Sequence, residues 1–184
     1  MSNRSGLTAR ALLAATWVGL GWTGGVRAED PSTADPLAGL EASADGVGWD
    51  GIRLGMSLVQ AERRFGVTLA LDGRPKARCA QFVAGAERGG LNLSVGFPTA
   101  KPGAKIDTIY VQFEGYQVAA NTQTLVASLK RKIPTARYLP DPARPERTEA
   151  EDLSPKYAVD GKVPAVIHLR VRDGVMITRP ECTP

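Results

Sequence analysis

The sequence contains few side chains that bind metals or act as nucleophiles. Its 184 residues include one His, His168, and two Cys, Cys79 and Cys182. The two Cys do not form a C-x-x-C pair, and a four-ligand zinc site would need acidic side chains in addition. Gly51 and Gly55 are not followed by Lys-Ser or Lys-Thr, so this segment is not a phosphate-binding loop. We therefore expect no metal, no cofactor and no catalytic residue.

Beyond residue 28 the sequence also lacks an apolar run long enough to cross a membrane. The first 28 residues have the order of a secretory signal: basic Arg4 and Arg10, an apolar stretch from Ala11 to Trp22, and the small-x-small site Val26-Arg27-Ala28. This pattern predicts a signal peptide over residues 1–28 and a periplasmic or secreted protein. The alternative is an amphipathic N-terminal helix of the mature fold.

The chain that remains after cleavage has no large excess of positive or negative charge. Residues 1–28 contain three Arg and no acidic residue, so their removal leaves 20 basic side chains against 19 acidic ones. Most of the apparent basicity thus belongs to the signal peptide, and we expect no nucleic-acid partner. No Cys lies at the cleavage site, so no lipid anchor is expected either.

Cys79 and Cys182 are expected to form one disulfide, because exported proteins reach compartments in which disulfides persist. Such a bond would join the middle of the chain to its C-terminal end. A metal site or a reactive thiol is the alternative.

The mature chain divides into a leader and one domain. Residues 29–46 are rich in Ala, Ser, Asp, Gly and Pro and are interpreted as a flexible leader, followed by a single domain over residues 47–184. Ser57 and Gln60 form a capping-box pattern that begins a helix ending at Gly66. A second helix carries the apolar stripe Leu125–Ile133 and ends before Pro134.

Alternating apolar residues predict strands around these helices. The expected strands are 51–55, 79–83, 91–97, 108–114, 157–159, 163–172 and 175–178. Asp-Gly turns are expected at 72–73, 160–161 and 173–174, and a long exposed loop over 141–156. The fold class is therefore α+β: an antiparallel sheet with two helices on one face, in two similar halves that each consist of a helix and strands.

The motif Gly51-Ile52-Arg53-Leu54-Gly55-Met56-Ser57, followed by Ala61 and Gly66, resembles that of a family of small exported bacterial proteins with a G-[IV]-R-[LI]-G-M-[ST] pattern. These resemble the SmpA/OmlA-type outer-membrane assembly lipoproteins and the β-lactamase-inhibitor-protein fold. The resemblance implies a fold of helix-plus-strand units and a role in binding. The chain lacks the lipidated Cys of the assembly lipoproteins.

One sheet face is the best candidate for a binding site. A two-residue turn at Asp173-Gly174 would pair Arg172 with Val175, Arg170 with Ile177 and His168 with Arg179 on one face. Tyr110 and Gln112 are further candidates for this face. Arg side chains recognise carboxylates, and the apolar residues beside them add contact area. The alternative is a solvated sheet face with no partner.

These observations lead to three functional hypotheses. The first is a non-enzymatic exported binding or accessory protein whose partner is a protein or a small anionic ligand. The second is an inhibitor of a periplasmic or extracellular enzyme. The third is a small hydrolase in which His168 is the general base.

Overall fold

The computed structural model describes residues 35–74, 77–88, 91–113, 122–170 and 174–183. These residues form two α-helices, α1 (Leu58–Phe65) and α2 (Thr122–Lys132), and two antiparallel sheets, which confirms the predicted α+β class. The smaller sheet consists of β1 (Leu40–Ser43), β2 (Gly46–Trp49) and β3 (Ile52–Arg53). The larger sheet has the order β4 (Asp72–Gly73), β5 (Phe82–Arg88), β6 (Leu91–Phe97), β7 (Thr108–Gln112), β11 (Gly174–Thr178), β10 (Ala165–Arg170), β9 (Lys156–Val159) and β8 (Arg137–Leu139).

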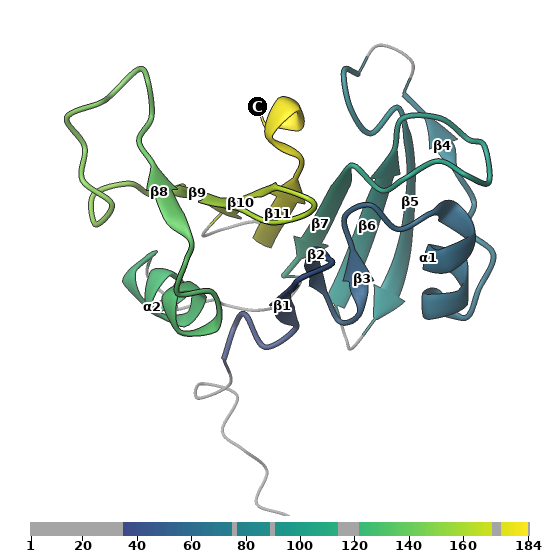
Figure 1. Ribbon diagram of the computed structural model, residues 1–184, viewed down its shortest axis with the longest axis horizontal. Helices are drawn as coiled ribbons and strands as arrows, with labels where there is room; N and C mark the ends of the chain where they lie inside the picture. The colour runs from purple at the N-terminus through teal and green to yellow at the C-terminus, as the bar shows by residue number, and fades with distance from the viewer. Residues whose placement is uncertain (1–34, 75–76, 89–90, 114–121, 171–173, 184) are drawn as a thin grey trace, which may run out of the picture.

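The larger sheet is joined at its centre by strands that are distant in sequence. Strands β4 to β7 follow α1, strands β8 to β11 follow α2, and the last strand of each run pairs with the other. In this pairing Val111 lies opposite Val175, and Ile109 lies opposite Ile177. Figure 1 shows α2 on one side of β8 to β11, with the 140–155 loop and the short 3₁₀ helix η1 (Pro180–Cys182) on the other.

One face of the larger sheet is buried. Its strands contribute alternate residues to a core that also contains Leu58 and Ala61 of α1 and Leu125 and Leu129 of α2. Both helices therefore cover the same face, as predicted. The fully buried sheet residues include Leu93, Val95, Ile109, Val111, Ile167, Leu169, Val175 and Ile177.

Trp49 fills the core between the two sheets. Its side chain is 2 % exposed, and its ring centroid lies 6.2 Å from that of Phe113. The only Trp that follows the predicted signal peptide is thus a core residue and does not present its ring to a partner.

Helix α1 begins and ends where the sequence predicts. The Ser57 hydroxyl accepts a hydrogen bond from the Gln60 N–H (3.3 Å), and the Gln60 side-chain oxygen accepts one from the Ser57 N–H (2.8 Å). Gly66 ends the helix in the left-handed region (φ 75°), where its N–H donates to the Glu62 carbonyl.

The ordered fold starts earlier than the sequence analysis expects. Residues 35–46 include β1 and the start of β2, and Leu37 and Leu40 are buried at 0 % and 3 % exposure. The sequence of this segment predicts a leader because its few apolar residues are scattered among Ala, Ser, Asp and Gly. The rest of the predicted leader, 29–34, and the predicted signal peptide lie outside the described residues.

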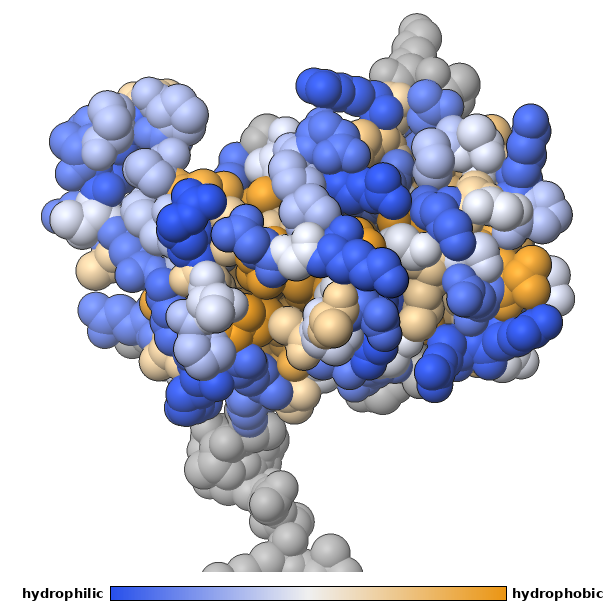
Figure 2. All heavy atoms as spheres, viewed as in Figure 1, coloured by the Kyte–Doolittle hydropathy of each residue, from blue (hydrophilic) through white to orange (hydrophobic). Residues whose placement is uncertain are grey.

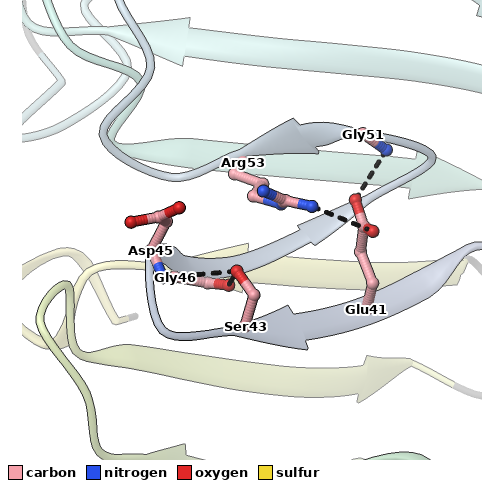
Figure 3. A network of polar contacts seen from close by, with 6 residues as sticks. All are labelled: Glu41, Ser43, Asp45, Gly46, Gly51 and Arg53. Atoms are coloured by element: carbon pink, nitrogen blue, oxygen red, sulfur yellow. Dashed lines mark hydrogen bonds and ion pairs between the residues drawn. The ribbon is translucent and has the colours of Figure 1, made fainter.

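Polar contacts hold the small sheet together (Figure 3). One Glu41 carboxylate oxygen accepts from the Gly51 N–H at 2.7 Å, and the other lies 3.3 Å from the Arg53 guanidinium. Asp50 and Gly51 both have positive φ and form the two-residue hairpin between β2 and β3. The leader segment is therefore tied to the predicted first strand by a carboxylate.

Several strand limits differ from the predictions. Asp72 and Gly73 form β4 and pair with β5, so they are not a turn. Strand β5 begins at Phe82, three residues later than predicted, and β8 is an edge strand that the sequence analysis does not predict. β4 and β8 are short strands at the two edges of the sheet, where the apolar alternation is weakest.

The predicted disulfide between Cys79 and Cys182 is present. It joins the segment before β5 to η1, across a sequence separation of 103 residues. This bond fixes the C-terminal end of the described chain beside the larger sheet.

Neither of the helices in the described part of the chain combines the length and the hydropathy that a bilayer crossing requires.

Candidate docking face

The second face of the larger sheet carries polar and aromatic side chains. Strand registers place Ser94, Tyr110, Met176, His168 and Lys156 in one row across five strands. A neighbouring row contains Gln112 and Arg170, on either side of Gly174. All of these side chains are half-buried or exposed. We call this surface, defined by Ser94, Tyr110, Gln112, Lys156, His168, Arg170 and Met176, the open face.

The structure brings four of the six predicted site residues to the open face. Tyr110, Gln112, His168 and Arg170 all lie there, and the Arg170 guanidinium is 5.8 Å from the centroid of the Tyr110 ring. This cation–π contact orients the Arg170 side chain over β7. Arg172, the fifth predicted residue, lies outside the described residues.

The predicted register of β10 and β11 is wrong. Arg170 pairs with Gly174 and His168 with Met176. This register differs by three residues from the one that a two-residue turn at 173–174 would give. An odd shift exchanges the two faces of a strand. Val175 and Ile177 are therefore fully buried in the core and do not flank Arg170.

Gly174 has a different role from the one that the sequence predicts. It has φ 132°, and a Cβ atom there would lie 1.8 Å from the Val111 carbonyl oxygen of β7. Gly174 is required because β11 packs closely against β7, and it is the first residue of the strand, not the second residue of a turn.

Arg179 is also misplaced by the sequence analysis. It follows the end of β11 and precedes η1, and its guanidinium lies 3.9 Å from the Glu181 carboxylate. Because Thr178 pairs with Val166, Arg179 lies past the end of the β10–β11 ladder and does not face His168.

A loop residue completes the surroundings of His168. The Ser154 hydroxyl lies 3.1 Å from His168 Nε2. Asp152 holds this part of the loop: one carboxylate oxygen accepts from the Ser154 N–H at 2.9 Å and the other from the Tyr138 hydroxyl at 3.2 Å. The side chain between them, Leu153, is 74 % exposed.

The same loop is anchored from the core side. The Lys130 ammonium group of α2 lies 3.2 Å from the Glu149 carboxylate, donates to the Ala136 carbonyl at 3.0 Å and sits 5.0 Å from the centroid of the Tyr157 ring. Leu153 and Ser154 are thus carried by a loop that is fixed at Glu149 and again at Asp152.

The electrostatic environment of the open face is positive. Burial, followed by the positive charges of Lys156 and Arg170, lowers the pKa of His168 to about 4, against an opposing effect of Asp152. His168 is therefore neutral at pH 7. The positive charge of this face comes from Lys156 and Arg170. A positive charge on Arg170 is what its predicted role in carboxylate recognition requires.

The Ser154–His168 pair has limited capacity for catalysis. His168 Nδ1 is buried and has no hydrogen-bond partner in the described part of the chain, so no acidic group orients the ring as in a catalytic triad. A base with a pKa near 4 removes a hydroxyl proton poorly at pH 7. The Asp152 carboxylate accepts hydrogen bonds from the Tyr138 hydroxyl and the Ser154 N–H.

The described residues also line two cavities away from the open face. One, of about 200 Å³, lies between α2 and residues 149–150. The other, of about 190 Å³, lies between the β1–β2 hairpin, the residues after α2 and residues 159–163. Figure 2 shows apolar side chains at the surface in this second region, on a face that is otherwise mostly hydrophilic. Neither of these two cavities is lined by an open-face residue.

Sequence reasoning missed Ser154, Asp152, Leu153, Lys156 and Met176. Asp152-Leu153-Ser154-Pro155 carries a turn signal, but nothing local indicates that it lies against His168. That contact depends on the β9–β10 register, in which Lys156 pairs with His168.

Comparison of the chain with protein-family models, with curated proteins and with solved structures found no match.

Proposed function

We propose that this chain is an exported, non-enzymatic binding protein that engages an acidic protein segment through its open face. The observation that supports this proposal is the composition of the surface: Arg170 and Lys156 beside Tyr110 and Met176, with the exposed Leu153 at its margin. Cations supply carboxylate recognition, and the aromatic and apolar side chains supply contact area.

Three features support export. Residues 1–28 have the composition and order of a secretory signal. The disulfide between Cys79 and Cys182 is of the kind that persists in oxidising compartments. The G-I-R-L-G-M-S motif resembles that of small exported bacterial proteins. A periplasmic or secreted location is therefore part of the proposal.

The test of the binding proposal compares two matched double charge reversals. Lys156→Glu with Arg170→Glu alters the open face, and Arg63→Glu with Lys101→Glu makes the same change in net charge at exposed positions in α1 and the β6–β7 loop. Each variant is used as bait against the exported proteins of the native host, with chemical cross-linking before capture. We expect the open-face variant to lose a captured protein that the other variant and the wild type retain. Equal capture by both variants would contradict the proposal.

A matched apolar pair tests the role of the loop. Leu153→Ala removes the exposed side chain beside Ser154, and Val67→Ala removes one that is 52 % exposed after α1. We expect only Leu153→Ala to weaken capture. Folding of every variant is checked by circular dichroism.

Inhibition of purified β-lactamases and cell-wall hydrolases by the wild type, lost in the open-face variant, would identify the partner as an enzyme.

The second candidate function is a small hydrolase, and the Ser154–His168 contact at 3.1 Å is the observation that favours it. Its test is turnover of p-nitrophenyl esters by the wild type and by Ser154→Ala and His168→Gln. We expect no turnover above the uncatalysed rate. Turnover that both substitutions abolish would replace the binding proposal with an enzymatic one.

A further inference from the structure

A buried carboxylate lies beside the disulfide. One carboxylate oxygen of Asp107 is within 4.8 Å of the sulfur atoms of both Cys79 and Cys182. Asp107 is 5 % exposed, whereas the two cysteines are only half-buried. In the sequence Asp107 is an isolated acidic residue before a strand, and nothing there indicates this position.

The surrounding backbone fixes the carboxylate in place. The Asp107 N–H donates to the Gly96 carbonyl at 3.0 Å, and the Asp107 carbonyl accepts from the Arg179 N–H at 3.1 Å. One side-chain oxygen accepts from the Ala80 N–H at 3.1 Å, which holds the turn after Cys79, where Ala80 has φ 51°. Asp107 thus joins three segments of the chain around the disulfide.

The other side-chain oxygen of Asp107 is not hydrogen-bonded. It is buried and has no hydrogen-bond partner among the described residues, and no Lys or Arg nitrogen of that part of the chain lies within 4.0 Å of the carboxylate. The guanidinium of neighbouring Arg179 is directed to Glu181. A buried polar atom without a partner costs folding free energy, and such an atom is often kept for a function.

The residue types could suggest a metal site, since two Cys and one Asp meet there. Both sulfur atoms are bonded to each other, however, and are not available as thiolate ligands. The feature that remains is a buried carboxylate beside a disulfide.

We propose that Asp107 protects the Cys79–Cys182 disulfide from thiol reductants by electrostatic repulsion. In reduction by a dithiol, a thiolate attacks one protein sulfur, a new S–S bond forms, and the electron pair of the broken bond leaves on the other protein sulfur. The second thiol of the reductant then closes its own disulfide, and the protein gains two electrons and two protons. The negative charge shared by three sulfurs in the transition state is disfavoured by a carboxylate beside it.

Burial alone does not give this protection, because both cysteines are half-buried. A reductant that reaches either sulfur must bring its negative charge within a few ångströms of Asp107. The proposal therefore predicts a rate effect that depends on the charge of the attacking group.

The experiment measures reduction of the oxidised mature protein by two reagents at pH 7.5, with free thiols trapped by maleimide and counted by mass spectrometry. Dithiothreitol attacks as an anion, and tris(3-hydroxypropyl)phosphine attacks as a neutral molecule. Asp107→Asn keeps an oxygen for the Ala80 N–H and removes the charge. We expect this variant to be reduced about tenfold faster than wild type by dithiothreitol, and only slightly faster by the phosphine.

Thr178→Ala is the control for loosening of the structure. Thr178 is 2 % exposed, and its hydroxyl lies 3.4 Å from that of Thr183, next to η1. This variant retains Asp107, so the rate of disulfide reduction should increase by the same factor with both reagents. If Asp107→Asn increases the rate of reduction by the same factor with both reagents, Asp107 only holds the turn and the proposal is overturned. An unchanged rate of reduction by dithiothreitol would also overturn it.

A measurement on the wild type alone covers the case in which Asp107→Asn does not fold. Cysteamine carries a positive charge and 2-mercaptoethanesulfonate a negative one. After normalisation to their rates with a neutral small-molecule disulfide, we expect the protein to react faster with cysteamine. Equal normalised rates would overturn the proposal.

Discussion

His168 and Ser154 are fourteen residues apart in the sequence, and their side chains meet at 3.1 Å on the open face. Strands β9 and β10 pair so that Lys156, two residues after Ser154, lies opposite His168. The contact therefore depends on the hairpin register and on the loop that Asp152 and Glu149 hold in place. It links the exposed Leu153 to the row of side chains across the sheet, so the loop and the sheet form one surface.

Stability should depend on pH through His168. Its folded-state pKa is lowered from 6.5 to about 4 by burial and by Lys156 and Arg170. As the pH falls below 6.5 the unfolded chain takes up a proton first, so the contribution of this residue to the free energy of unfolding declines between pH 6.5 and 4 and then levels off. Urea midpoints at pH 7 and pH 5 should differ more for wild type than for His168→Gln. The same difference in both proteins would assign the pH dependence to other groups.

Removal of the disulfide should destabilise the fold. The bond closes a loop with a sequence separation of 103 residues, for which the chain-entropy account gives at most about 4 to 5 kcal/mol. Thermal unfolding of the Cys79→Ala, Cys182→Ala double variant should occur well below that of the oxidised wild type. The double variant should not respond to dithiothreitol, and an unchanged unfolding temperature would contradict the prediction.

Deletion of the segment before Gly46 should also destabilise the domain. Leu37 and Leu40 are almost fully buried, and each buried Leu contributes about 1.5 to 3 kcal/mol. A chain that begins at Gly46 should lose about 3 to 6 kcal/mol of unfolding free energy by urea denaturation relative to one that begins at Asp35. Equal stability of the two chains would show that residues 35–45 are a leader after all.

Loss of the cap of α1 should have a smaller effect. Ser57→Ala leaves the Gln60 N–H without its acceptor and should cost about 1 kcal/mol. Val59→Ala, at a position that is 39 % exposed on the same helix, should change the free energy of unfolding by less than about 0.5 kcal/mol. Urea denaturation of both variants measures the difference. A larger loss from Val59→Ala would indicate that the cap is not what stabilises the helix end.

Local signals in the sequence were sufficient for the helices and for most central strands. The Ser57–Gln60 box and Gly66 define α1 through contacts within ten residues. The alternation in residues 91–97 and 108–114 likewise predicts β6 and β7 as an antiparallel pair. These elements depend on hydrogen bonds and periodicity that neighbouring residues determine.

Long-range contacts determined what the sequence could not show. Gly174 allows β11 to approach Val111 of β7 closely. The Asp-Gly pair in the sequence cannot show whether the glycine is needed for this approach or for a turn. The β10–β11 register keeps Arg170 and His168 on one surface but places Arg179 outside it. Ser154 joins that surface through a loop that Lys130 anchors from α2, a relationship with no local sequence signal.

The central position of β11 has a consequence for the order of folding. This strand is the last in chain order, yet it lies between β7 and β10 in the middle of the larger sheet. Until residues 174–178 have been synthesised, strands β5 to β7 and β8 to β10 have no common neighbour to join them. The complete sheet can therefore form only after its final strand is present, and folding should be slow because the contacts that join the two groups of strands are far apart in sequence.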